Sequence, residues 1–258
     1  MIKKQGGVLL KILLVNDDGI WAEGINILAK ELIKKHDVYI CAPSGEQSGM
    51  SQALSVGIPL YVKEEHLSIA VKKAFSVDGK PADCTKLALE ILLKDENIDM
   101  VISGINKGAN LGTDVLYSGT VGAGLEGYSH KIRSLAVSVS SKSKISFDQI
   151  AEIIADKLEY FYQTDDLFMY NINFPMEINS GKIEFVFTKQ GFRRYENEFD
   201  IVILDNGNIA YKMQGRAQDI GNDEFTDIAV TKRGCISVTP LTLERTDFIK
   251  LNKLNSLK

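Results

Sequence analysis

Short apolar runs that end in polar turns alternate with amphipathic segments over the first 175 residues of the chain. The runs have the length and composition of buried strands, and they lie at residues 12–15, 37–41, 99–103, 132–139 and 168–174. Between them, helices are expected over residues 23–36, where apolar side chains recur at helical spacing, and over residues 81–92, 118–130 and 146–162, of which 118–130 is rich in glycine. Strands that alternate with helices form right-handed βαβ units. The pattern therefore predicts an α/β fold with a doubly wound, mostly parallel sheet.

Two of the expected helices have further signals in the sequence. Pro81 suits the first turn of a helix, and the core face of that helix is predicted to comprise Cys84, Leu87, Ala88, Ile91 and Leu92. Ser146 and Gln149 have the spacing of a capping box, which predicts the start of the helix that runs through Tyr162. Residues 61–77 are expected to hold short strands.

The character of the chain changes after Pro175. Strand-like runs follow one another without intervening helices, at residues 182–189, 199–204, 209–213 and 236–239, and a short helix is expected from Asp247. Asp205-Asn206-Gly207 is a turn sequence that predicts a hairpin. We expect residues 8–175 to form the catalytic α/β domain. Residues 176–258 are expected to form a β-rich arm outside the central sheet that serves oligomerisation, the alternative being a hairpin folded back on its own chain.

Composition restricts the partners and the compartment. Cys41, Cys84 and Cys235 form neither a disulfide framework nor a metal-binding pair, which favours small buried side chains in a reducing cytoplasm. Thirty basic and thirty-four acidic residues give a net charge of −4, which argues against a stable nucleic-acid partner. No run approaches the roughly 18 apolar residues of a membrane span. The apolar stretch 8–15 is interrupted by Lys11 and predicts a strand, with a loose extension before it.

Three polar loops follow three of the predicted strands. They occupy residues 16–19, 43–49 and 104–110. The carboxyl ends of parallel strands lie at one edge of the sheet, where ligands bind in this architecture. The three loops are therefore expected to meet there, although they are distant in sequence.

Asp17 and Asp18 place two carboxylates side by side at the end of the first strand. Such close like charges repel each other unless a cation neutralises them. Oxygen ligands of this kind suit Mg²⁺ or Mn²⁺, and the hydroxyl of Ser48 and the amide oxygen of Asn106 are candidate further ligands. The alternative is an Asx-type turn in which one Asp caps the next helix.

The sequence Ser118-Gly119-Thr120 opens the glycine-rich helix with a good N-cap residue. Free N–H groups and hydroxyls at a helix start bind anions, so near a divalent cation these residues predict a phosphate site. Asn110 is a candidate donor to the same phosphate. The alternatives are a simple N-cap at Ser118 and a loop-forming Asn110 that tolerates a left-handed backbone.

Other candidate motifs carry less weight. Residues 122–127 fit G-x-G-x-x-G, but they lie inside the predicted helix and favour a closely packed helix face over a dinucleotide site. Neither a P-loop nor a G-x-S-x-G elbow is present in the sequence. His36, His66 and His130 lack the spacing of metal ligands and are expected to be structural or solvated, His36 at a helix end that favours a cation.

Taken together, the loops resemble the SurE family of survival-protein 5′-nucleotidases. The resemblance covers most of the chain, through residues 12–20, 42–44, 47–49, 81–84, 103–106, 108, 110–112, 117–121, 171–175 and 236–241. Two positions depart from the family pattern: Lys80 stands where the family usually has Thr, and Cys235 replaces a common aromatic residue.

The resemblance implies a Rossmann-like α/β domain with a C-terminal hairpin arm used in homodimers or homotetramers. It implies one divalent metal ion, Mg²⁺ or Mn²⁺, on Asp17, Asp18, Ser48 and Asn106. It also implies phosphate contacts from Asn110 and from residues 118–120. Lys80 is expected to influence substrate preference.

The expected activity is hydrolysis of nucleoside 5′- or 3′-monophosphates by a metal-dependent phosphatase. Asp17 or Asp18 is the candidate for orienting the water or acting as a base, and the sequence does not choose between them. Two alternatives stay open at this point. One is a non-catalytic nucleotide-binding regulatory module, and the other is a metal-dependent glycosyltransferase, which also uses paired aspartates.

Overall fold

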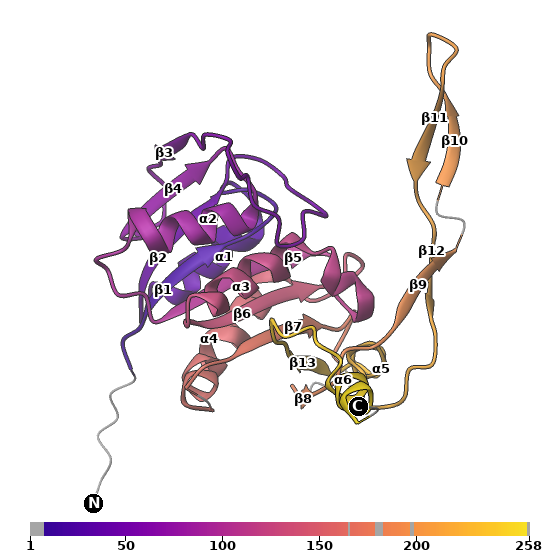
Figure 1. Cartoon of the computed structure of the whole chain (residues 1–258). Coiled ribbons are helices and arrows are strands. Elements are labelled where there is room, and N and C mark those ends of the chain that lie inside the picture. Colours follow the sequence, from indigo (N-terminus) through magenta and orange to yellow (C-terminus); the bar gives the residue numbers. More distant parts are fainter. Residues whose placement is uncertain (1–7, 165, 179–182, 197–198, 257–258) are drawn as a thin grey trace, which may run out of the picture.

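The computed structural model of the chain describes residues 8–164, 166–178, 183–196 and 199–256. Figure 1 shows a sheet covered by helices, from which a long two-stranded arm extends. The loose extension expected before Val8 lies outside the described residues. The α/β fold with a mostly parallel sheet is confirmed.

Nine strands form the central sheet, in the order β3-β4-β2-β1-β5-β6-β7-β13-β8. The run from β4 to β7 is parallel throughout, whereas β3 and β13 pair antiparallel with their neighbours β4 and β7. The strands are β1 (Lys11–Val15), β2 (Asp37–Pro43), β3 (Val62–Glu64), β4 (Lys73–Val77), β5 (Met100–Lys107), β6 (Arg133–Val139), β7 (Met169–Phe174), β8 (Phe185–Phe187) and β13 (Ile236–Pro240).

Helices cover both faces of this sheet. The two helices α1 (Glu23–Leu32) and α4 (Phe147–Thr164) pack on one face, and α2 (Pro81–Leu87) and α3 (Gly119–Ser129) pack on the other. Side chains of β1 alternate between the two cores: Ile12 and Leu14 join the first, Leu13 and Val15 the second. All four are fully buried, and each contributes roughly 1.5–3 kcal/mol of hydrophobic stabilisation.

The helix that begins at Pro81 differs from the prediction in its second half. It is α-helical only to Leu87 and continues as the π-helix η1 (Ala88–Leu92). The N–H of Leu93 donates to the carbonyl of Ala88, five residues back. This wider turn changes the phase of the side chains, so Leu93 is buried while Ile91, predicted in the core, is 62% exposed.

Two other predicted boundaries also move. The helix expected over residues 23–36 ends at Leu32 and is followed by turns. Strand β5 continues past Ser103 to Lys107, through a bulge between Gly104 and Asn106, and the 3₁₀-helix η2 (Gly112–Leu116) follows. The buried side chain of Ile105 explains the strand extension, because it packs into the core with α1. The predicted capping box is confirmed, since Ser146 and Gln149 exchange backbone-to-side-chain hydrogen bonds of 3.0 and 3.3 Å.

The segment after Pro175 is divided between the central sheet and the arm. Strands β8 and β13 belong to the sheet, which corrects the expectation that this segment stands wholly outside it. The reason is that β13 pairs along β7 and is buried on both faces, with Ile236 and Val238 in the core. Figure 1 shows the remaining strands projecting away from the body, namely β9 (Arg193–Glu196), β10 (Phe199–Ile203), β11 (Ile209–Met213) and β12 (Arg216–Asp219).

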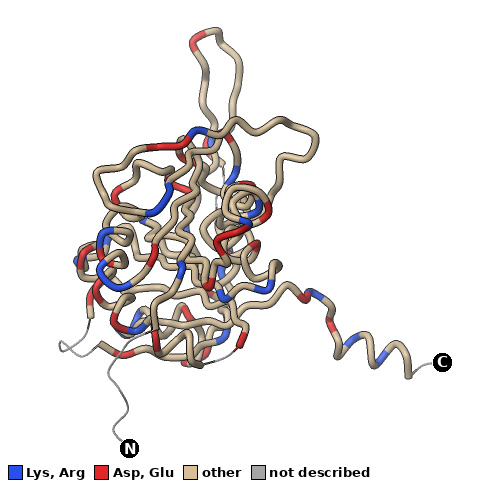
Figure 2. The backbone as a smooth tube through the Cα atoms, turned by 90° about the vertical axis from the view of Figure 1, so that its left-hand side faces the viewer, with Lys and Arg blue, Asp and Glu red and all other residues tan. Residues whose placement is uncertain are grey.

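The predicted hairpin is confirmed, and it does not fold back on its own chain. Its strands β10 and β11 pair antiparallel around the turn at residues 204–208. Helix α5 (Asp227–Lys232) packs near β13, whereas the C-terminal helix α6 (Phe248–Asn255) has no buried residue and stands away from the body in Figure 2.

Lys and Arg are interspersed with Asp and Glu over the body in Figure 2. Within the described ranges, no helix combines the length and the hydropathy needed to cross a membrane. Cys41 and Cys84 are buried and unpaired, but Cys235 is only partly buried, which corrects its predicted burial. It follows a surface turn, and its thiol lies 3.9 Å from Glu184.

Candidate functional site

Four polar segments meet at the carboxyl edge of β1, β2 and β5. The N–H of Gln47 donates to the carbonyl of Asp17 at 2.7 Å, which joins the loop after β2 to the loop after β1. The carboxylate of Asp18 accepts a hydrogen bond from the backbone of Lys107, at the end of β5. Ser51 donates to the carbonyl of Tyr117, just before α3, at 2.9 Å. The predicted convergence of these loops is therefore present in the structure.

Asp17 is buried within the site. The residue is 5% exposed, and its Oδ1 accepts the hydroxyl hydrogen of Thr120 at 2.6 Å. A Cβ atom placed on Gly119 would lie 2.9 Å from the Cβ of Asp17, so no larger residue fits at the start of α3 without displacing the carboxylate. The first turn of α3 therefore fixes the position of Asp17.

The Asx turn at the end of β1 is formed by Asn16, not by either aspartate. The amide of Asn16 donates to the carbonyl of Gly19 at 2.8 Å and accepts from its N–H at 3.2 Å. Helix α1 begins after Ala22 without a side-chain cap. Neither Asp17 nor Asp18 caps this helix, which removes the alternative explanation for the paired carboxylates.

The two carboxylates lie in an environment that disfavours their negative charge. Burial is the main cause that raises the pKa of Asp17, against hydrogen bonds from Thr120 that lower it. Burial, followed by the charges of Asp17 and Glu46, raises the pKa of Asp18 to about 6. A bound cation would reverse this effect, because opposite charge favours the ionised form.

The further ligand candidates lie in the loops that meet here. Ser48 is exposed, and its hydroxyl donates to Glu46 at 2.8 Å. The side-chain N–H of Asn106 donates to the carbonyl of Gly108 at 2.6 Å, which leaves its amide oxygen as the acceptor. In the described part of the chain, no three His, Cys, Asp or Glu side chains form a metal-binding group. A cation here would therefore depend on two carboxylates and neutral oxygen atoms.

The residues predicted to bind phosphate have distinct roles in the structure. The hydroxyl oxygen of Ser118 accepts from the N–H of Val121 at 3.1 Å, which confirms it as the N-cap of α3. The backbone N–H of Thr120 as well as its hydroxyl faces Asp17. Thr120 thus contacts the carboxylate rather than open space, and phosphate binding by residues 118–120 stays a prediction.

Asn110 belongs to a buried polar network beneath the site. Its side-chain N–H donates to Ser138 at 2.8 Å, and its backbone N–H donates to Asn173 at 2.8 Å. Its carbonyl accepts from the amides of Asn171 and Asn173 at 2.8 and 3.0 Å. The asparagines of β7 therefore anchor the loop that follows β5. A phosphate contact from Asn110 remains a prediction.

The glycine-rich sequence 122–127 forms a packing face of α3. A Cβ atom on Gly122 would lie 2.1 Å from the carbonyl oxygen of Ser51, and one on Gly127 would lie 2.7 Å from Val101 and Ser134. This contact supports the interpretation of the motif as close packing. His130 pairs with Glu90 at 2.9 Å, which accounts for it as a structural residue.

Lys80, the departure at the start of α2, contacts the loop after β2. Its Nζ donates to the hydroxyl of Ser55 at 3.1 Å, and Ser55 in turn donates to both oxygens of Asp83. Lys80 therefore helps to hold that loop against α2. Its effect on substrate preference stays a prediction.

A pocket of about 310 Å³ opens beside Ser118. Its walls come mainly from the loop after β2, from η2, from α3 and from the end of β13 and the chain that follows it. The lining residues are Ser51, Gln52, Val115, Leu116, Ser118, Gly122, Leu125, Gln190, Pro240, Leu241, Thr242, Glu244 and Arg245. The sequence did not predict this pocket, nor the charge of Glu46 near the aspartates. Both depend on how separate segments pack, for which the sequence has no periodic signal.

Comparisons with known proteins identify the family of the chain. The sequence model of the family described as Survival protein SurE matches residues 12–197. The chain is 41% identical to the 5′-nucleotidase SurE of Pelotomaculum thermopropionicum, over 96% of this chain and 95% of that one. It is 37% identical to the 5′-nucleotidase SurE of Alkaliphilus metalliredigens, over 96% and 98% of the two chains.

The fold is similar to a solved structure as well. The crystal structure of the SurE protein from Aquifex aeolicus superposes with a TM-score of 0.79 at 32% identity, covering 96% of this chain and 99% of that one. The family match spans the loops that meet at the sheet edge, and the structural match spans the sheet that positions them. The chain belongs to the SurE family.

Proposed function

We propose that this chain is a divalent-metal-dependent phosphatase that hydrolyses nucleoside 5′-monophosphates, and 3′-monophosphates, to nucleoside and phosphate. Full-length relatives that bear the name 5′-nucleotidase support the reaction class. The observation that carries the proposal is the position of two adjacent carboxylates: Asp17 is held against the first turn of α3, and Asp18 lies beside the end of β5. The carboxylates would bind a cation, and the helix N-terminus beside them would bind a phosphate.

The donor set fits one Mg²⁺ or Mn²⁺ ion. Asp17 and Asp18 would supply carboxylate oxygens, Ser48 a hydroxyl and Asn106 an amide oxygen. Burial raises the pKa of both aspartates, and a bound cation would offset this effect by favouring their ionised forms. When bound, such a cation polarises a phosphoryl group and lowers the pKa of a coordinated water.

The residues of this chain then bind and orient the substrate. The N-terminus of α3 offers its dipole and the N–H of Gly119 to the phosphoryl oxygens, where negative charge develops during hydrolysis. Thr120 holds Asp17 in place through its hydroxyl. Asp18 is the less buried carboxylate, and its second oxygen has the freedom to orient the attacking water.

Assembly through the arm is part of the proposal. Alternate residues of β10 and β11 form one apolar face, in which Phe199 pairs with Met213, Ile201 with Tyr211, and Ile203 with Ile209. Each of the six is at least 54% exposed in the single chain. A two-stranded ribbon is marginal in water on its own, so a second copy of the chain is the expected cover, in a homodimer or homotetramer. The free cysteines favour the cytoplasm as the compartment.

Phosphate release from a substrate panel tests this function. Nucleoside 5′- and 3′-monophosphates and a small aryl phosphate are incubated with the protein in Mg²⁺, Mn²⁺ or EDTA. The proposal predicts release that requires a metal. Nucleotide binding in calorimetry without phosphate release under any metal would instead support the non-catalytic binding module. Turnover confined to sugar nucleotides would support a glycosyltransferase.

A further inference from the structure

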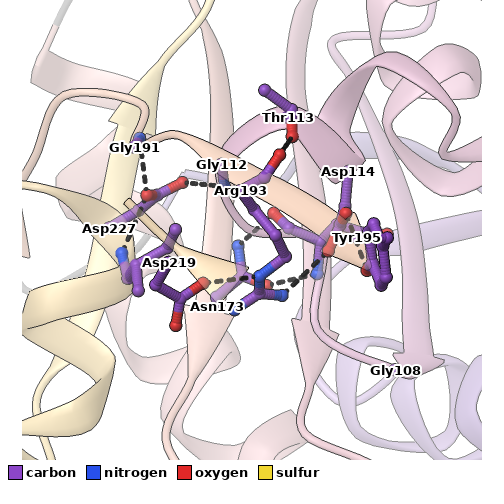
Figure 3. A network of polar contacts seen from close by, with 12 residues as sticks. Gly108, Gly112, Thr113, Asp114, Asn173, Gly191, Arg193, Tyr195, Asp219 and Asp227 are labelled. Carbon is purple, nitrogen blue, oxygen red and sulfur yellow. Dashed lines mark hydrogen bonds and ion pairs between the residues drawn. The ribbon is translucent and has the colours of Figure 1, made fainter. Parts of the chain in front are cut away.

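The root of the arm and helix α5 together bind three consecutive residues of η2 (Figure 3). The N–H of Gly112 donates to Asp227 at 2.9 Å, and the hydroxyl of Thr113 donates to the carbonyl of Arg193. The carboxylate of Asp114 accepts from the Arg193 guanidinium at 2.8 Å and from the Tyr195 hydroxyl at 2.9 Å. This short helix is therefore fixed by residues that lie about 80 positions or more further along the chain.

Arg193 is the centre of this network. Its Nη1 binds Asp114 and its Nε binds Asp219, each at 2.8 Å, so that one guanidinium bridges η2 and β12. The three side chains are only 14–16% exposed. Partial burial of this kind makes the ion pairs stronger than surface pairs and costly to break from one side.

The opposite side of η2 faces the candidate site. The carbonyls of Leu116 and Tyr117 accept hydrogen bonds from Ser51 at 2.7 and 2.9 Å, and the N–H of Ser118 donates to the carbonyl of Asp114 at 3.2 Å. Val115 and Leu116 also form a wall of the pocket beside Ser118. The same short helix therefore contacts the arm on one side and the proposed phosphate site on the other.

We propose that the pocket beside Ser118 receives the nucleoside part of the substrate, and that Arg193 is a positioning residue that fixes its η2 wall. This inference rests on the proposed function. The pocket has apolar side chains from Leu116, Leu125 and Leu241 for the faces of a base, and polar groups from Gln52 and Gln190 for its edges. Its volume of about 310 Å³ is at the lower end of the range for small-ligand sites.

The test compares two substrates in Arg193→Gln. A nucleoside monophosphate uses both the phosphate site and the pocket, whereas a small aryl phosphate depends mainly on the phosphate site. We expect KM for the nucleotide to rise about tenfold, with kcat for both substrates changed less than about threefold. Arg193→Lys, which keeps the charge but not the two-pronged geometry, should restore part of the affinity.

Two variants serve as matched controls. Arg194→Gln makes the same change of charge on the next residue of β9, where the side chain is exposed and points to the other side of the strand. Ile201→Asp alters the apolar face of the hairpin and leaves the Arg193 network intact. Both should keep the nucleotide KM of the unmodified protein. Assembly is measured by sedimentation velocity and folding by thermal unfolding.

The outcomes separate this inference from the proposed function. Absence of phosphate release by the unmodified protein would contradict the proposed function. The role of Arg193 would be overturned if Arg193→Gln is active with an unchanged nucleotide KM. It would also be overturned if the nucleotide KM rises as much in Ile201→Asp as in Arg193→Gln. If Arg193→Gln does not fold, Asp114→Asn and Tyr195→Phe replace it. Both should raise the nucleotide KM in the same direction by a smaller factor, and unchanged values in both would overturn the inference.

Discussion

Thr120 shows how a single hydroxyl organises the candidate site. Its hydroxyl binds Asp17 at 2.6 Å in a region where neither residue is appreciably exposed. Thr120→Val keeps the shape of the side chain but leaves the carboxylate with one donor fewer, a loss of about 1–2 kcal/mol. We expect kcat for a nucleoside monophosphate to fall about tenfold. Thr120→Ser, which keeps the hydroxyl, should retain most activity, and an undiminished Val variant would contradict this role.

The surroundings of His36 favour its uncharged imidazole, contrary to the expectation that its helix-end position favours a cation. Its Nδ1 accepts the N–H of Leu10 at 3.3 Å. Burial, followed by the charge of Lys35, lowers its pKa, and Glu159 opposes this effect. The unfolded chain therefore binds more protons below pH 6.5, so stability falls as the pH drops through that value.

Chemical denaturation at pH 7.5 and pH 5.5 tests this linkage. On going from pH 7.5 to pH 5.5, the free energy of unfolding should decrease more in the unmodified protein than in His36→Gln. The difference between the two decreases should be below about 1 kcal/mol. Glutamine keeps an acceptor but does not titrate. Equal pH dependence in the two proteins would show that His36 does not contribute.

The paired aspartates and their companion loops were predictable from sequence, since strand ends in a parallel sheet share one edge. Arg193 was not, because its partner Asp114 lies 79 residues away and no periodic pattern connects them. The contact of Thr120 with Asp17, rather than with open space, also depends on packing. Sequence reasoning therefore located the candidate site but not the contacts that hold it.

Helix α3 depends on glycine for its approach to the loop after β2. In Gly122→Ala the new methyl group would lie 2.1 Å from the carbonyl oxygen of Ser51, a backbone atom that has little freedom to move. We expect a loss of roughly 2–4 kcal/mol in stability, measured by denaturant unfolding. Gly45→Ala is the control, because nothing lies within 4 Å of its added methyl group. Equal stability of the two variants would contradict the close contact.

The elements were predicted best where periodicity alone decides them. The parallel strands and helix α1 follow from hydrophobic spacing, and the start of α4 follows from its capping box. The π-helix at residues 88–92 could not be predicted in this way, because the same residue types fit an α-helix and a π-helix equally well. The placement of β13 in the central sheet also escaped prediction, since an apolar strand after a change in composition fits a separate arm equally well.

At the scale of the whole molecule, the arm is the feature that most needs a partner. Ile201→Asp places a charge in the apolar face of β10 and β11, which should weaken any association through that face. We expect sedimentation velocity to show a smaller assembly than that of the unmodified chain at equal concentration. Lys212→Ala, on the opposite face of the hairpin, should leave the assembly unchanged. An Ile201→Asp protein of unaltered size would contradict assembly through this face.

Metal-dependent phosphate release is the most direct test of the central claim, that adjacent acids at the sheet edge hold a cation against a phosphate ester. Phosphate is measured from a nucleoside monophosphate with the unmodified protein and with folded Asp17→Asn, each in Mg²⁺, Mn²⁺ or excess EDTA. The account predicts release by the unmodified protein only with metal, and a loss of at least about a hundredfold in Asp17→Asn. Turnover that persists after thorough chelation, or a fully active Asp17→Asn protein, would contradict it.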